Sequence, residues 1–258
     1  MGSKVKVENK RISLVNASGF LESPDDYAET PLGGKMTHDQ FAVWSVYLDL
    51  FESKWGLSHA TSEYLGSIGG DVFEAEFSVH GKKAYSTSLV LPIRNALYAS
   101  FMGELRWRYL REMGIMTPVL DYGCGVGVFL LWLHHKGYKD LYGYELPGVQ
   151  NSIMRAAFEN TDIRVWDESP AGFKTIICLN VLEHVEHPVE LLEKFYSMSN
   201  RVIADICIDK DDEGQTPHIA PVDELLECKR ILESKRSLYC YEPTQKGKGV
   251  YRGVREAV

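Results

Sequence analysis

The fold of this chain is decided by the stretch Pro118-Val-Leu-Asp-Tyr-Gly-Cys-Gly-Val-Gly-Val-Phe-Leu-Leu-Trp-Leu133. Its short apolar start, Val119–Leu120, predicts a buried strand, because such runs bounded by Pro and Gly are typical of one. Asp121 closes the strand, a turn with three glycines follows, and Val128–His135 predicts a helix. Glycines let the backbone turn tightly and let a ligand approach main-chain atoms. Strand, glycine turn and helix form half of a nucleotide-binding unit, in which the helix N-terminus offers free N–H groups.

The spacing of the glycines separates two kinds of nucleotide site. Dinucleotide-binding folds carry G-x-G-x-x-G, whereas this chain has glycines at 123, 125 and 127, and Val128 stands where the third fingerprint glycine would be. A NAD-type oxidoreductase is therefore only an alternative. The run Leu120-Asp-Tyr-Gly-Cys-Gly-Val-Gly127 instead resembles the first motif of class I S-adenosylmethionine (SAM) dependent methyltransferases.

Downstream of the turn, apolar runs alternate with helical patterns, which predicts an α/β fold with a mostly parallel, Rossmann-like sheet and helices on both faces. Thr175–Asn180 is the most continuously apolar run and is predicted to be the central strand. The other predicted strands are Leu141–Glu145, Ile163–Trp166 and Arg201–Ile208. The predicted helices are Pro147–Phe158, Pro188–Ser199 and Val222–Glu233, and a closing antiparallel pair is expected at Ser237–Tyr241 and Val250–Val254.

The N-terminal part predicts a mostly helical extension. Residues 1–36 show little pattern, and Thr37-His-Asp-Gln40 is typical of a capping box. A helix ending at Gly56 should follow, because apolar residues recur at spacings of three and four. This stripe either packs into the core or forms a wall facing the substrate, and it consists of Phe41, Trp44, Leu48, Phe51 and Trp55.

A possible hairpin, with strands at Val72–Val79 and Tyr85–Leu91, leads to a predicted helix from Pro92 to about Met113. We therefore predict two parts. Residues 1–91 form an N-terminal arm and substrate-covering segment, and residues 92–258 form the SAM-binding domain.

Composition excludes several other classes. The chain has 258 residues, 45% of them hydrophobic, and a net charge of −8, so nucleic acid is an improbable partner. There is no apolar run of the ~18 residues that a membrane span needs, and no signal peptide is predicted. The 5 cysteines include no C-x-x-C pair, which favours a reducing, cytoplasmic location. The oligomeric state stays open.

Acidic residues follow the predicted strands at the edge where ligands bind in open α/β sheets. Glu145 lies about twenty residues beyond the glycine turn, the position at which a carboxylate accepts hydrogen bonds from ribose hydroxyls. The alternative is an exposed acid preceding the helix that starts at Pro147. Asp167 and Glu168 either accept from the adenine amino group or form a polar loop.

A second motif, Cys178-Leu-Asn-Val-Leu-Glu-His-Val-Glu-His-Pro188, resembles the Val-Leu-Glu-His-Val signature of quinone-biosynthesis O-methyltransferases and many small-molecule methyltransferases. With the first motif and Glu145, the resemblance covers roughly residues 105 to 230. It implies SAM as cofactor and O- or N-methylation of a small molecule, with Asp121 helping to hold the methionine ammonium. The other residues expected to line the cofactor are Gly123, Cys124, Gly125, Gly127, Leu146, Asn180 and Leu182. A protein that retains the fold and performs no transfer stays an alternative.

Two histidines are candidate catalytic residues. His184 follows Glu183, and in the quinone O-methyltransferases an E-x-x-E-H run supplies metal ligands. Here Asn180 replaces the first glutamate, which disfavours a metal. His218 is a candidate general base or third ligand, and hydrogen bonding near the cofactor is the alternative for both histidines. No base accompanies Cys124 in sequence, so a nucleophilic role is not expected.

Overall fold

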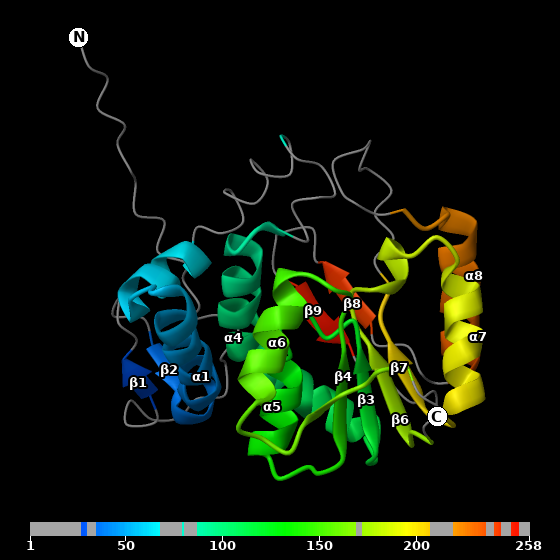
Figure 1. Ribbon diagram of the computed structural model, residues 1–258. Coiled ribbons are helices and arrows are strands. Elements are labelled where there is room, and N and C mark those ends of the chain that lie inside the picture. Colours follow the sequence, from blue (N-terminus) through cyan, green and yellow to red (C-terminus); the bar gives the residue numbers. More distant parts are fainter. Residues whose placement is uncertain are drawn as a thin grey trace.

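The computed structural model describes residues 27–29, 35–67, 79, 87–168, 172–206, 219–235, 240–243 and 249–252. Its centre is a five-stranded parallel sheet in the order β5-β4-β3-β6-β7 (Figure 1). The strands are β3 (Val119–Tyr122), β4 (Leu141–Tyr144), β5 (Arg164–Val165), β6 (Thr175–Cys178) and β7 (Val202–Ala204). The predicted α/β fold is confirmed. The middle strand, however, is β3, whereas the sequence predicted β6. Hydrophobicity alone does not distinguish the two strands, because both are buried on both faces.

Helices cover both faces of the sheet, as predicted. Successive residues of a strand point to opposite faces, so β3 sends Val119 into one core and Leu120 into the other. The first core is completed by α4 (Val90–Glu112), α5 (Val128–His135) and α6 (Val149–Phe158). The second is completed by α7 (Pro188–Met198) and α8 (Val222–Ser234), which stand together in Figure 1.

The N-terminal helix α1 (His38–Trp55) belongs to the first core. Thr37 and Gln40 form the predicted capping box, and Gly56 ends the helix in the left-handed conformation, with φ 67°. The apolar stripe packs against α4 and α5, and Trp44, Leu48 and Phe51 are fully buried. The core alternative for the stripe is therefore confirmed at these three residues.

The structure corrects several boundaries. Helix α4 begins at Val90, two residues before Pro92, because Ser88 Oγ accepts the Val90 N–H (3.2 Å) and starts the helix there. The end of the second predicted hairpin strand is therefore helical, and residues 68–78 and 80–86 lie outside the described residues. Strands β4, β5, β6 and β7 end one to four residues earlier than predicted, because the chain leaves the sheet to form the turns of the carboxyl edge.

Two small antiparallel pairs of strands lie before and after the five-stranded sheet in the sequence. β1 (Tyr27–Glu29) pairs with β2 (Lys35–Thr37), in a segment for which no pattern was predicted, because strands of 3 residues are too short to show a period. Met36 of β2 is fully buried. The predicted closing pair is confirmed as β8 (Cys240–Pro243) and β9 (Gly249–Arg252). In the described ranges, no helix has the length and apolar character needed to cross a membrane.

Candidate functional site

The glycine turn after β3 is tied to the end of β4. The N–H groups of Gly123 and Cys124 both donate to the Tyr144 carbonyl, at 2.8 and 3.0 Å, and Gly127 N–H donates to the Cys124 carbonyl at 2.9 Å. Gly123, Gly125 and Gly127 have φ of 70°, 60° and 84°, which other residues adopt only with strain. The turn therefore needs glycine at all three positions.

Alanine at Gly127 should destabilise the protein more than alanine at Gly137. Both glycines have left-handed φ, 84° and 86°, so each substitution costs about 1 kcal/mol for backbone strain. A Cβ at Gly127 would also lie 2.4 Å from Phe158 Cζ, whereas nothing lies within 4 Å of one at Gly137. Crowding of this kind adds about 1–3 kcal/mol. Urea unfolding should show the difference, and equal losses would contradict it.

Glu145 follows β4 and faces the glycine turn. Its Oε2 accepts the Gly125 N–H at 2.7 Å and its Oε1 accepts the Leu146 N–H at 3.1 Å. Burial raises the pKa of Glu145, and these two backbone hydrogen bonds oppose the rise. Helix α6 begins only at Val149 and has no side-chain cap. The carboxylate thus belongs to the turn and does not cap the following helix, and its predicted contact with ribose stays a prediction.

Two buried aspartates lie beneath this edge of the sheet. Burial raises the pKa of Asp121, on β3, to about 7, and the Arg106 guanidinium from α4 opposes the rise. Burial also raises the pKa of Asp205, next to β7, to about 6, opposed by the Asn180 N–H and by Arg106. Arg106 is therefore a counter-charge for both carboxylates. Asp205 Oδ1 accepts the Asn180 N–H at 2.5 Å and holds that residue at φ 54°.

The residues predicted to contact the adenine lie on the exposed side of the same edge. Asp167 and Glu168 follow β5, and both are exposed. Glu168 has φ 65°, and its Oε1 accepts a hydrogen bond from Tyr144 Oη at 2.8 Å, which lowers the pKa of the carboxyl. Leu146 is 65% exposed. The structure therefore leaves these side chains accessible to a ligand, and their roles stay predictions.

The second motif forms a short 3-10 helix, η3 (Leu182–His184), after β6. Leu182 is fully buried in the second core, so its side chain does not reach the surface of the edge. The Glu183 carbonyl accepts the N–H groups of Ile219 (2.9 Å) and Ala220 (3.2 Å). The residue that follows His218 therefore lies beside η3, although His218 itself is outside the described residues.

Residues 96–206, a little under half of the chain, match the model of the family described as "Methyltransferase domain". This segment therefore resembles methyltransferase domains, whose cofactor is S-adenosylmethionine. The match includes the glycine turn, Glu145, both buried aspartates and η3.

Three solved structures that resemble the chain share 19–23% identity with it. Monomeric WbdD is 23% identical, with a TM-score of 0.39 over 48% of this chain and 36% of that one. Magnesium protoporphyrin IX methyltransferase (ChlM) from Synechocystis PCC 6803, solved with bound SAH, is 19% identical, with a TM-score of 0.40 over 55% and 73% of the two chains. A SAM-dependent methyltransferase from Mesorhizobium loti is 23% identical, with a TM-score of 0.34 over 38% and 52%.

The chain thus spans about a third of the WbdD structures' length. No curated protein matches it.

Of the histidines and the cysteine near the predicted site, His134 and Cys124 have surroundings that fit structural roles, whereas His184 is exposed. His134 Nε2 lies 2.9 Å from Asp162 Oδ1 at the end of α5, which fits a structural role. Burial raises the pKa of the Cys124 thiol, so this cysteine is not a ready nucleophile. His184 is exposed, and its Nε2 lies 4.0 Å from Glu183 Oε1. Among the described residues, no three His, Cys, Asp or Glu side chains are grouped as metal ligands. The catalytic roles of His184 and His218 stay predictions.

Three residues of the methyltransferase domain and its surroundings were missed by the sequence analysis. Val181 lies against the turn, since its Cγ2 is 2.4 Å from where a Cβ on Gly123 would be. Arg106 shares a helical spacing with Met102 and Leu110, so a charged residue on a largely apolar face was a usable signal. Tyr47, which contacts the turn from α1, carried no signal beyond its place in an amphipathic helix.

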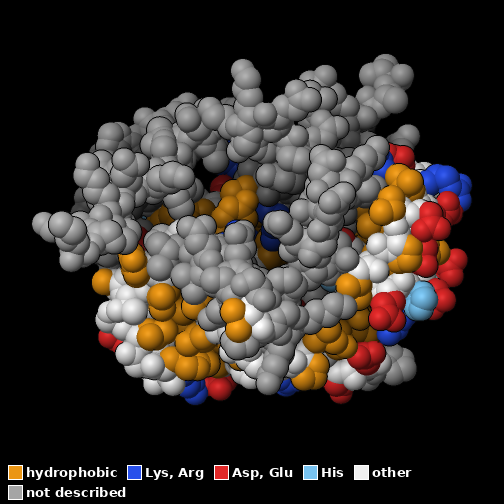
Figure 2. Space-filling model, turned by 90° about the horizontal axis from the view of Figure 1, so that it is seen from above, with side chains coloured by type: hydrophobic (Ala, Val, Ile, Leu, Met, Phe, Trp, Pro, Cys, Tyr) orange, Lys and Arg blue, Asp and Glu red, His pale blue; other side chains and the backbone are white. Residues whose placement is uncertain are grey.

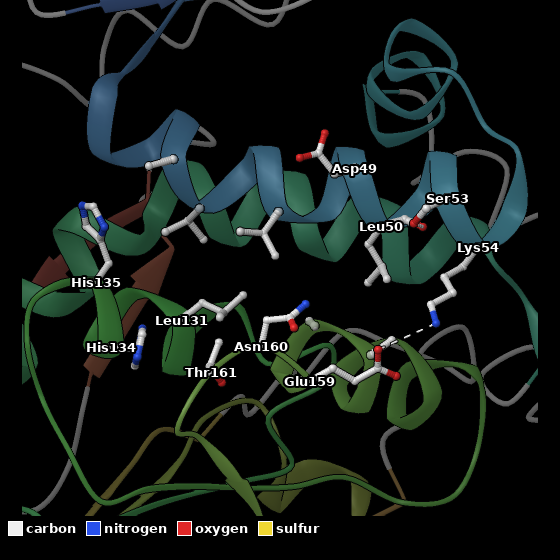
Figure 3. Close-up of a pocket in the computed structure, with 15 residues that line it drawn as sticks. Asp49, Leu50, Ser53, Lys54, Leu131, His134, His135, Glu159, Asn160 and Thr161 are labelled. Carbon is white, nitrogen blue, oxygen red and sulfur yellow. Dashed lines mark hydrogen bonds and ion pairs between the residues drawn. The ribbon is translucent and has the colours of Figure 1, made fainter.

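A groove of about 590 Å³ lies elsewhere, between α1, α5 and α6 (Figure 3). Its floor is largely apolar and includes Val43 and Leu131, and the ion pair of Lys54 with Glu159 (3.7 Å) crosses one end. None of its lining residues belongs to the glycine turn or to the predicted cofactor set. The groove is therefore separate from the residues predicted to bind the cofactor.

Proposed function

We propose that this protein transfers the methyl group of SAM to an oxygen or nitrogen atom of a small molecule. The observation that supports this most strongly is the bond between Glu145 and the glycine turn, inside the segment that matches methyltransferases. A carboxylate there suits ribose hydroxyls, while Asp121 beneath the turn suits the methionine ammonium. Cys124, Leu146 and Asn180 would complete the walls, with Asp167 and Glu168 toward the adenine.

The donor supplies an activated sulfonium, so the chain's own contribution is to bind and orient the reactants. Proximity and orientation of this kind contribute about 7–11 kcal/mol to catalysis. Gly123 and Gly125 adopt left-handed φ and carry no side chain, so the space beside the main chain of the turn stays open to a ligand. His184, which is exposed on η3, would remove the proton of the methyl acceptor, and an acceptor that ionises easily would need no base.

The charges of the described residues favour a neutral or cationic acceptor. At the carboxyl edge, Arg106 is opposite the carboxyl groups of Asp121 and Asp205, and Lys194 lies 3.4 Å from Glu168. With Glu145, the described acidic groups named here outnumber these two cations. Asp and Glu side chains also gather on the side of α7 and α8 when the molecule is viewed from above (Figure 2). A polyanionic acceptor such as nucleic acid would be repelled by these charges.

Incubation of the full chain with methyl-labelled SAM and a metabolite extract tests this function. We expect label to appear in one or a few small molecules, identified by mass spectrometry. Tight SAM binding without any labelled product would favour a protein that binds SAM and performs no transfer. Binding of NADH in preference to SAM would contradict the proposal entirely.

Deleting residues 1–26 should leave SAM affinity within about threefold of that of the full chain. Every predicted cofactor contact lies beyond residue 120, and the deletion stops short of β1 and the buried Met36. If the arm covers the acceptor, turnover should fall much more than SAM affinity, because closing segments exclude water and hold the acceptor. Turnover and affinity are measured on the same truncated protein, and unchanged turnover would mean that the arm does not cover the site.

A further inference from the structure

Helix α1 contacts the glycine turn although it lies outside the segment that matches methyltransferases. Tyr47 Oη donates a hydrogen bond to the Val126 carbonyl at 2.7 Å, across 79 residues of sequence. Tyr47 is fully buried and Val126 is 2% exposed. The bond therefore joins two groups that have no access to bulk water. The hydroxyl group donates to the carbonyl group, so each group has a hydrogen-bonding partner in place of water.

The same helix is fastened to the other end of α5. Asp39, in the first turn of α1, pairs with His135 (Nε2 to Oδ1, 2.8 Å) and with Lys136. Asp39 and Tyr47 are about 12 Å apart along α1, at 1.5 Å per residue, and α5 has a matching length of 8 residues. Helix α1 thus lies antiparallel to α5 and is held to it at two points, its first turn and its middle.

The carbonyl that Tyr47 holds belongs to the peptide unit between Val126 and Gly127. The N–H of this unit donates to the Cys124 carbonyl at 2.9 Å, so both of its polar groups are fixed. Glycine on its C-terminal side makes rotation of this unit easier, because φ is little restricted at Gly127. Rotation would leave the carbonyl without a partner in a buried place, which is unfavourable.

We propose that Tyr47 is a positioning residue for SAM binding. Its hydroxyl fixes the Val126–Gly127 peptide unit, and with it the orientation of the neighbouring Gly125 N–H that Glu145 accepts. Helix α1 is then part of the cofactor site and not a separate cover. This inference rests on the proposed function, since it concerns the affinity of the same turn for SAM.

The test is Tyr47→Phe in the full chain, which keeps the ring and its contact with Phe51 (centroids 6.2 Å apart) and removes only the hydroxyl. Thr175→Val is the matched control. Thr175 is also fully buried, and its Oγ1 makes two hydrogen bonds with the Met116 backbone (2.9 Å each) at the opposite, amino edge of the sheet. Calorimetry with SAM is done at a temperature at which both variants are folded.

We expect Tyr47→Phe to lose SAM affinity about tenfold and Thr175→Val to lose less than twofold, even where their melting temperatures fall equally. Amide hydrogen exchange should also quicken at residues 123–127 only in Tyr47→Phe. If that variant does not fold, Asp39→Asn, which loosens the far end of α1, should lose affinity about threefold. Affinity within twofold of the wild type in the folded Tyr47→Phe protein, or an equal loss in Thr175→Val, would overturn the inference. A wild-type chain that does not bind SAM would instead overturn the proposed function.

Discussion

Replacing Glu145 by Gln should weaken SAM binding at least tenfold, as measured by calorimetry on the full chain. The carboxylate accepts the N–H groups of Gly125 and Leu146 through separate oxygens. Glutamine has one oxygen and one NH₂ group, so one backbone N–H would face another donor. Ribose hydroxyls would lose a charged acceptor at the same time, and a hydrogen bond to a charged group contributes about 1.5–3 kcal/mol.

Glu159→Gln is the matched control for this substitution. Glu159 is an exposed acid at the end of α6, and its ion pair with Lys54 spans 3.7 Å at the rim of the separate groove. Exposed pairs of this kind contribute about 0–1 kcal/mol, so the control should fold and bind SAM as the wild type does. An unchanged affinity in a folded Glu145→Gln protein would exclude the ribose assignment.

The parts of the site that the sequence predicted are those with local signals. A short apolar run followed by alternate glycines marks β3 and its turn, and the spacing to Glu145 follows from one strand–helix–strand unit. The capping box at Thr37 and the glycine at 56 set the two ends of α1 for the same reason. Each of these features depends on residues close together in the chain.

The parts that the sequence did not predict depend on contacts between distant residues. Arg106 lies opposite Asp121 and Asp205 because α4 packs into the first core beside the sheet, and no local pattern carries that information. The bond from Tyr47 to Val126 joins positions 79 residues apart. Leu182 was expected to line the cofactor, yet η3 turns it into the second core, since a three-residue helix has no period to read.

The buried Asp121 should make the protein more stable without ligand at low pH than at high pH. Its folded pKa, about 7, lies above the ordinary value of 3.8. Its contribution is therefore fully present below about pH 4 and is lost as the pH rises through 7. Asp121→Asn should then stabilise the ligand-free protein at pH 7.5 by up to about 4 kcal/mol. The loss of the charge interaction between Asp121 and Arg106 reduces this gain. Urea unfolding at pH 5 and 7.5 measures this difference.

The same ionisation should govern SAM affinity in the opposite sense. The methionine ammonium needs the charged form of Asp121, so affinity should rise roughly twentyfold from pH 5.5 to 7.5 as a group with a pKa of about 7 ionises. It should fall again as the α-amino group of SAM, with a pKa of about 7.7–8.0, loses its proton.

Asp121→Asn should bind SAM more weakly and without the rise below pH 7.5. Asp205→Asn is the control, because Asp205 is buried to a similar degree but accepts the Asn180 N–H, and its pKa is about 6. That variant should alter stability between about pH 4 and 6 and keep the rise in affinity near pH 7. Calorimetry across this range distinguishes the two aspartates, and a rise that persists in Asp121→Asn would show that another group holds the ammonium.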